Sequence, residues 1–184
     1  MTPVTWALVG VGALLLVSLL VMYNRFVRQR TLVDESWGGI DVELTRRHDL
    51  IPQLVDTVKG YAAHEQALLT RLVEAREAAT SHHTDSPAHR QGYEDSLGGA
   101  LQQLLARVEA YPDLEASESF LALQDELTNT EDRIAASRRF YNGNVRAYNT
   151  RVRTFPSNLV AAVFRFRPRE FFELREAVRP PVAG

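Results

Sequence analysis

The first 24 residues contain no charged side chain, whereas all 44 charged residues, 21 basic and 23 acidic, lie between Arg25 and Arg179. Residues 4–22 read VTWALVGVGALLLVSLLVM, and 15 of these 19 residues are apolar. As an α-helix this stretch would be about 28 Å long, close to the hydrocarbon core of a bilayer. A signal peptide would carry basic residues before its apolar stretch, but no basic residue precedes this one. The pattern therefore predicts an uncleaved membrane anchor over residues 1–24.

The flanking charges predict the orientation of this anchor. Arg25, Arg28 and Arg30 follow it directly, and no Lys or Arg precedes it. By the positive-inside rule we expect a single-pass cell-membrane protein with its N-terminus outside and residues 25–184 in the cytoplasm. No two small residues stand four apart between Thr2 and Met22, so a dimer through a small-xxx-small motif is not expected.

From Val33 onward, apolar residues recur at alternating steps of four and three, the spacing of the buried stripe in a left-handed helical bundle. The stripe consists of Val33, Trp37, Ile40, Leu44, Ile51, Leu54, Val58, Tyr61, Leu68, Leu72, Ala75 and Ala79. Arg47 and Glu65 are its two interruptions. Pro52 removes the helical hydrogen bond to His48, but the phase is unchanged after it. We therefore expect helix on both sides of Pro52, with a kink or a tight break.

Two further apolar runs cover residues 97–111 and 120–155, ended by Pro112-Asp113 and by Pro156. Ser117 is the expected N-cap of the second run, and the Asn142-Gly143 pair within it is interpreted as weakened helix. Residues 157–164 could form a short helix capped by Ser157, and the polar residues 80–91 a loop or a poorly ordered connection. The expected fold class is all-α: one transmembrane helix, then an elongated antiparallel bundle of three long helices plus a short C-terminal helix.

Three segments together resemble the LemA family. They are IDVELTRRHDLIPQLVDTVKGYAAHE at 40–65, LLARVEAYPDLEASESFLALQDELTNTEDRIAASRRFYNGNVRAYN at 104–149, and FPSNLVAAVF at 155–164. The resemblance implies a single-pass anchor, a helical cytoplasmic domain and no established enzymatic activity, and magnetosome-associated relatives point toward membrane organisation. The sequence departs from the family pattern at Gly39, where relatives often carry Gln, and at Arg165, where they often carry Gly.

The sequence offers little support for catalysis. It contains no cysteine, no G-x-S-x-G motif and no Gly-rich phosphate loop after a strand. His48 and His64 are sixteen residues apart and would face opposite sides of a straight helix. A second group, His82, His83, Asp85 and His89, could supply metal ligands but lies in the stretch expected to be a loop. We therefore expect no catalytic residue, no cofactor and no metal site.

Charge segregates along the last third of the chain. Residues 109–132 contain eight acids and no Lys or Arg, whereas residues 133–179 contain eleven arginines and three acids. The opposite charges could pair within one chain. They could also attract adjacent copies and support a lateral homo-oligomer. The candidate assembly residues are Glu131, Asp132, Arg138 and Arg139.

Arg165, Arg167 and Arg169 alternate with phenylalanines, a pattern compatible with nucleic acid or with anionic lipid. A sequence pI near 6.2 and the expected anchor argue against nucleic acid. The expected partners are the lipid bilayer, a second copy and other membrane proteins. The sequence thus favours a non-enzymatic, self-associating membrane scaffold. The alternatives are a module that binds anionic lipid or another anion through the Arg-rich part, and an unrecognised enzyme.

Overall fold

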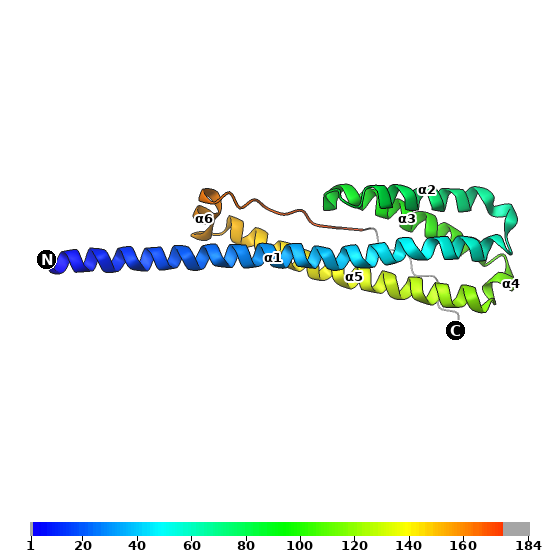
Figure 1. Cartoon of the computed structure of the whole chain (residues 1–184), viewed down its shortest axis with the longest axis horizontal. Helices are drawn as coiled ribbons and strands as arrows, with labels where there is room; N and C mark the ends of the chain where they lie inside the picture. The colour runs from blue at the N-terminus through cyan, green and yellow to red at the C-terminus, as the bar shows by residue number, and fades with distance from the viewer. Residues whose placement is uncertain (1, 175–184) are drawn as a thin grey trace. The chain divides into compact units, whose positions relative to one another are not determined.

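The structure, a computed structural model, describes residues 2–174, and every regular element within that range is helical (Figure 1). The elements in chain order are α1 (Pro3–Lys59), the 3-10 helix η1 (Ala63–Glu65), α2 (Gln66–Ser81), α3 (Pro87–Val108), α4 (Pro112–Glu115), α5 (Glu118–Arg153) and α6 (Ser157–Val163). The expected fold class, all-α with one long apolar N-terminal helix, is confirmed. The Arg179-Pro180-Pro181 tail lies outside the described residues.

Two compact units share these helices. Within the described residues, unit 1 contains 2–37 and Phe140–Glu170, and unit 2 contains Gly38–Arg139 and 171–174. Both α1 and α5 contribute a segment to each unit because they are long, at 57 and 36 residues. The units are described separately below.

Unit 2 is a bundle of four helical segments from α1, α2, α3 and α5. Ion pairs join Arg46 and Arg47 of α1 to Glu126 and Glu131 of α5, and an ion pair joins Glu65 to Arg107 at the far end of α3. The core between the segments is aliphatic apart from Phe120. It contains Leu50, Ile51, Leu54, Val55, Val58, Leu69, Leu72, Leu97, Leu101, Leu104, Val108, Leu114, Phe120 and Leu127. The sequence stripe therefore marks the buried face except at Tyr61, which is 50% exposed in the reversal after α1.

The stripe does not mark one continuous helix, and here the prediction of three long helices was wrong. Helix α1 ends at Lys59, and the chain reverses through residues 60–65 before α2 begins. The amides of Tyr61 and Ala62 both donate to the carbonyl of Val58, closing the last turn. Gly60 lowers the helix propensity at that point. The phase survives the reversal because both helices pack on the same core.

The connection after α2 is shorter than expected. Residues 80–91 were predicted to form a loop, but α2 continues to Ser81 and α3 begins at Pro87. Pro is well suited to the first helical position, where its missing N–H would have no partner. By contrast, the prediction at Ser117 is confirmed, since its Oγ accepts from the amide of Phe120 at 3.2 Å. Helix α5 also runs through Asn142-Gly143, as expected.

Helix α1 runs through Pro52, which confirms the prediction of helix on both sides. Because Pro52 has no N–H, the carbonyl of His48 loses its usual helical donor. Arg76 of α2 replaces that donor, since its Nε donates to the His48 carbonyl oxygen at 3.0 Å. The proline in α1 is therefore compensated by a side chain from the neighbouring helix.

Unit 1 combines the N-terminal part of α1 with the end of α5, with α6 and with the extended residues that follow it. Its buried centre is aromatic: the ring of Phe26 stacks on Phe166 at 4.8 Å and meets the edge of Tyr148 at 6.2 Å. Asn149 fixes the extended segment, because its side chain both donates to and accepts from the backbone of Arg169 at 2.8 Å. Tyr141 donates to the Glu170 carbonyl at 2.9 Å.

Helix α6 matches the expected short C-terminal helix, but Ser157 does not cap it as expected. Pro156 is the N-cap residue, and the Ser157 hydroxyl donates instead to the carbonyls of Arg151 and Thr154. Arg151 lies in the last turn of α5, and Thr154 directly follows that helix. Ser157 therefore helps to close the preceding helix.

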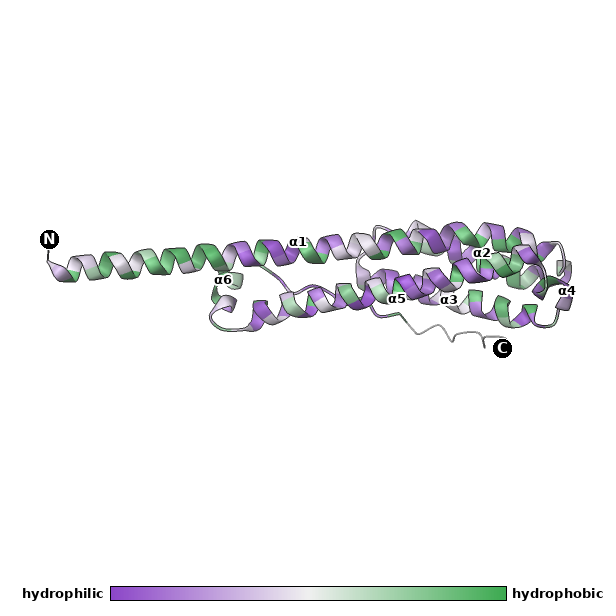
Figure 2. Ribbon diagram, turned by 90° about the horizontal axis from the view of Figure 1, so that it is seen from below, coloured by the Kyte–Doolittle hydropathy of each residue, from purple (hydrophilic) through white to green (hydrophobic). Residues whose placement is uncertain are grey.

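The apolar stretch of α1 is long enough to cross a membrane. Its most apolar 18-residue window has a mean hydropathy of 2.5, and none of that window is buried by the described residues. Figure 2 shows the stretch as the green run of helix beside the N-terminus. The core helix of a soluble protein would bury such a surface, so the full exposure indicates a membrane-associated protein.

The compensation at Pro52 predicts an energetic coupling between Pro52 and Arg76. Arg76→Met keeps the aliphatic stem but removes the donor, and should cost about 1 kcal/mol by leaving the His48 carbonyl unsatisfied. In the Pro52→Ala background the restored amide can bond to His48, so the same change should cost much less. Thermal unfolding of the detergent-solubilised chain, followed by circular dichroism, measures both. Equal costs in the two backgrounds would refute the compensation.

Candidate functional site

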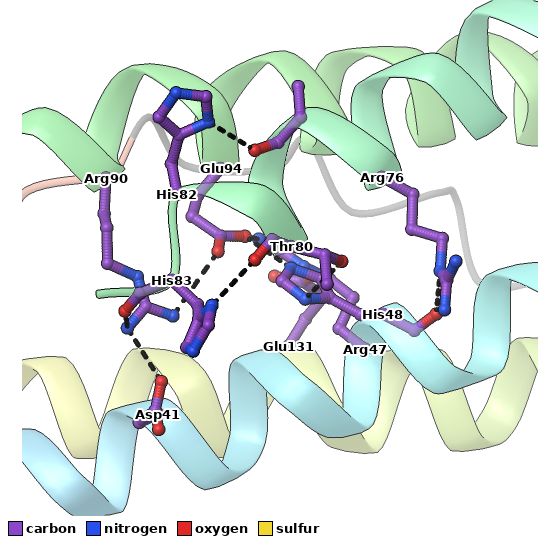
Figure 3. A network of polar contacts seen from close by, with 11 residues as sticks. Asp41, Arg47, His48, Arg76, Thr80, His82, His83, Arg90, Glu94 and Glu131 are labelled. Atoms are coloured by element: carbon purple, nitrogen blue, oxygen red, sulfur yellow. Dashed lines mark hydrogen bonds and ion pairs between the residues drawn. The ribbon is translucent and has the colours of Figure 1, made fainter. Parts of the chain in front are cut away.

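A cluster of charged side chains is buried inside the helix bundle of unit 2 (Figure 3). At its centre, Arg47 of α1 bonds to two carboxylates: Nη2 to Glu94 Oε2 at 2.6 Å and Nη1 to Glu131 Oε1 at 2.7 Å. The side chains of Arg47 and Glu94 are 3% and 1% exposed. This one guanidinium therefore ties α1 to α3 and to α5 within the core.

A second arginine extends the cluster. Arg90 of α3 is also buried, and its Nη1 donates to Asp41 Oδ1 at 2.7 Å and to the carbonyl of His83 at 2.8 Å. Its Nη2 lies 3.8 Å from Glu94 Oε1. Arg90 therefore links α3 to α1 and to the connection between α2 and α3.

His48 adds the fourth helix to the cluster. Its Nε2 lies 3.2 Å from Glu94 Oε2, and its Nδ1 lies 3.4 Å from the hydroxyl of Thr80 on α2. The neighbouring residue on α1, Arg47, binds the same carboxylate oxygen. Glu94 is thus the carboxylate that Arg47 and His48 of α1 and Arg90 of α3 share.

The ionisation of Glu94 reflects two opposing effects. Burial alone would raise its pKa, but the hydrogen bond with His48 and the charge of Arg47 outweigh burial and hold the pKa below its ordinary value. Burial likewise acts to lower the pKa of Arg47, and the charges of Glu131 and Glu94 raise it overall. The ion pair is therefore the stable state of both groups at neutral pH.

The buried charges occupy positions that the helical periodicity assigns to the core. Arg47 interrupts the apolar stripe of α1, and Arg90 and Glu94 extend the stripe of Leu97 and Leu101 by the same steps of four and three. Arg47 stands out in the sequence as an interruption of the stripe, whereas Arg90 and Glu94 were not predicted. The available signal was charged residues in register with a buried stripe. Glu65, the other interruption, also forms an ion pair, with Arg107 at 2.7 Å.

This arrangement fixes helix register and offers little chemistry. A buried ion pair contributes little net stability over an apolar replacement, but breaking it leaves an uncompensated charge. A helix that shifted by one turn would leave Arg47 or Glu94 unpaired. The cluster therefore selects one packing of the four helical segments.

The structure places the sequence-predicted assembly residues in different settings. Glu131 bonds to Arg47 within the chain. Arg138 donates to the Leu174 carbonyl at 2.6 Å. Asp132 and Arg139 are exposed on α5.

The three predicted residues in the Arg-rich segment also differ from one another. Arg165 and Arg167 are exposed, whereas Arg169 pairs with Asp34 at 2.7 Å. All three lie in the segment that follows α6, and this segment belongs to unit 1.

The histidines near the α2–α3 connection make local contacts. His82 stacks on Tyr93 with ring centroids 3.9 Å apart, and its Nδ1 lies 2.8 Å from the Ala78 carbonyl. His83 Nδ1 lies 2.9 Å from the Thr80 carbonyl. Among residues 2–174, no group of three or more His, Cys, Asp or Glu side chains is placed to hold a metal ion.

Comparison with known proteins identifies a family. The model of the LemA family matches residues 36–183. Magnetosome protein MamQ 2 of Paramagnetospirillum magneticum is 25% identical over 189 residues, covering 90% of this chain and 70% of that protein. Protein LemA of Metamycoplasma hominis is 29% identical over 140 residues, covering 75% and 63%. MamQ of Magnetospirillum gryphiswaldense is 24% identical over 189 residues, covering 90% and 70%.

The buried cluster predicts a large difference between two adjacent arginines. Arg47→Met removes the central cation from two carboxylates and should cost about 3–5 kcal/mol. Arg46→Met is the matched control, because Arg46 is 40% exposed and pairs with the exposed Glu126, so its loss should cost at most about 1 kcal/mol. Thermal unfolding of both variants measures the difference. Similar losses of stability in the two variants would mean that the buried ion pairs of Arg47 are not important for the stability of the core.

The same cluster gives a pH dependence. Because the folded pKa of Glu94 is lowered, its contribution is fully present above the unfolded pKa of about 4.3. It is lost as the pH falls through the folded pKa. Thermal stability should therefore fall more steeply below about pH 4.3 in the parent chain than in Glu94→Gln.

Proposed function

We propose that this chain, which belongs to the LemA family, is a single-pass membrane-anchored scaffold or interaction protein without catalytic activity. The single observation that carries the proposal is the helix α1. Its apolar N-terminal stretch is exposed along its length, and the same helix continues into the ion-paired core of unit 2. A rigid helical body on an anchor suits a protein that positions others.

The orientation is part of this proposal. Arg25, Arg28 and Arg30 follow the apolar stretch, and we infer that the body lies in the cytoplasm. A reporter that works only in the cytoplasm should be active when fused after Gly184. Activity of an exported reporter at the same position would refute this orientation.

The absence of catalysis is supported by how the polar side chains are used. The buried Arg47 and Arg90 both form ion pairs with the buried Glu94 in unit 2. A catalytic carboxylate or cation, by contrast, must reach a substrate. The names of the relatives agree with a structural role, since they are given as magnetosome proteins and as LemA.

Self-association is the finer part of the proposal. Exposed acidic residues are concentrated on α4 and the start of α5, and exposed arginines on the end of α5 and beyond. The exposed acids are Glu109, Asp113, Glu115, Glu118, Asp125, Glu126 and Asp132. Glu131 and Arg138 bond within the chain, and we take the exposed Asp132 and Arg139 as the candidate contacts between copies. Opposite charges on neighbouring copies would then set their register.

Light scattering of the full-length protein in mild detergent tests this assembly. We expect an oligomer at about 0.1 M salt and dissociation toward 1 M, because the screening length falls from about 10 Å to about 3 Å. Arg139→Glu should weaken the oligomer, and mixing with Asp132→Arg should restore part of it. Lys59→Glu is the control, since Lys59 lies outside the Arg-rich segment and pairs with Asp56 at 4.0 Å. A monomer at both salt concentrations would remove the case for assembly.

A further inference from the structure

Helix α6 presents an apolar surface to its surroundings. Leu159 and Val163 are 58% and 74% exposed and lie one turn apart on the same face of α6, and Phe155, in the turn that precedes α6, is 74% exposed. On the other face Val160 and Ala161 are buried within unit 1. No charged residue occurs between Arg153 and Arg165. A helix whose exposed side is apolar, rather than polar, marks an interaction surface.

The position of α6 within unit 1 relates it to the membrane-spanning stretch. Phe164, directly after α6, contacts Tyr23 with ring centroids 4.8 Å apart, and Phe166 contacts both Tyr23 and Phe26. Tyr23 follows the last residue of the apolar stretch, Met22. Tyrosine at such a position favours the boundary between lipid and water. Helix α6 therefore lies beside α1 close to the C-terminal end of the apolar stretch (Figure 1).

Basic residues predominate in unit 1. Residues 2–33 and 140–169 contain nine arginines and no Asp or Glu, and the rest of the unit adds the acids Asp34, Glu35 and Glu170. Arg151 and Arg153 precede the uncharged stretch that contains α6, and Arg165 and Arg167 follow it. The pKa of Arg151 is lowered by burial and by the nearby positive charge of Arg25. Cations are thus gathered around an apolar helix without carboxylates from the same segments.

The backbone at Arg165 ends α6. Its φ is +58°, in the left-handed region that favours glycine. The amides of Arg165 and Phe166 donate to the carbonyls of Ala162 and Ala161, which is the usual hydrogen-bond pattern of a helix that closes through a left-handed residue. The exposed Arg165 therefore follows directly after α6.

We propose that α6 lies in the interface of the same bilayer that α1 spans, with Phe155, Leu159 and Val163 among the lipid chains. Anionic lipid headgroups bind the flanking Arg151, Arg153, Arg165 and Arg167. This inference rests on the membrane anchoring proposed above and adds a second, peripheral contact to it. The mode is that of an interfacial helix, whose apolar face enters the boundary between headgroups and acyl chains and whose cations meet headgroups.

A second copy of this chain is the weaker candidate for the apolar face. A symmetric contact would bring α6 against α6 and place the flanking arginines of both copies together. Like charges in contact oppose such an association. An anionic bilayer instead covers the apolar residues and neutralises the cations, so it satisfies both features at once.

The chain contains no cysteine, which makes the test direct. Full-length protein carrying Val163→Cys is labelled with a fluorophore sensitive to polarity and reconstituted in vesicles of phosphatidylcholine with phosphatidylglycerol. We expect a blue-shifted emission that is quenched by lipids carrying a quencher in the upper acyl chain. Val42→Cys is the matched control, because Val42 is 61% exposed but belongs to unit 2, and its label should remain in water.

Charge is tested by composition and by substitution. Each basic residue near an anionic surface is worth roughly a factor of five in affinity, so replacing all four flanking arginines by glutamine should weaken docking by several hundred-fold. Quenching at position 163 should therefore fall in that variant, and in vesicles of phosphatidylcholine alone. Equal quenching in both vesicle types would overturn the role of anionic headgroups.

The outcomes separate this inference from the anchoring itself. Flotation of the protein with vesicles after an alkaline wash reports the anchor. A protein that floats while its label at position 163 stays in water refutes only the docking of α6. A label that is shielded but not quenched by lipid, and that cross-links between copies, assigns the face to a second copy and overturns the proposal. Failure to float would refute the anchoring.

Discussion

A charge inside a helical bundle must be paired, and unit 2 is organised around that requirement at Arg47 and Glu94. Their contact joins α1 to α3, and the second carboxylate on Arg47, from Glu131, joins α1 to α5. Apolar packing alone would tolerate a helix shifted by one turn, because leucine and valine recur along every stripe. The ion pairs remove that freedom, since a shift would strand a charge whose burial is costly without its partner.

The same constraint explains what the sequence revealed and what it concealed. The period of 3.5 residues correctly marked the buried faces, and Arg47 and Glu65 stood out as charges within a stripe. Periodicity reports which side of a helix is buried, but it carries no information about the partner across the core. The contacts of Arg47 with Glu94 and of Glu65 with Arg107 each join residues more than 40 positions apart. Such pairs emerge only when the topology is known.

Helix ends show a similar division between local and long-range information. The cap at Ser117 and the helix on both sides of Pro52 follow from local chemistry and could be predicted. The reversal after Lys59 could not, because the stripe keeps its phase when two helices fold onto one core. The donor from Arg76 to His48 was equally hidden, since it comes from a helix that the sequence pattern had merged with α1. A single glycine at position 60 was the only local sign.

Buried charges are paired within the core of unit 2, but most arginines of unit 1 have no carboxylate in their own segments. Its segments up to residue 33 and from 140 to 169 contain arginines without carboxylates, and the described pair of Arg169 with Asp34 neutralises one of them. The remaining cations surround an exposed apolar helix, a combination that internal packing could have avoided by burying α6. Water solvates the cations but not the phenylalanine and valine beside them. A surface that offers hydrocarbon and anions within a few ångströms satisfies both, and a bilayer boundary is such a surface.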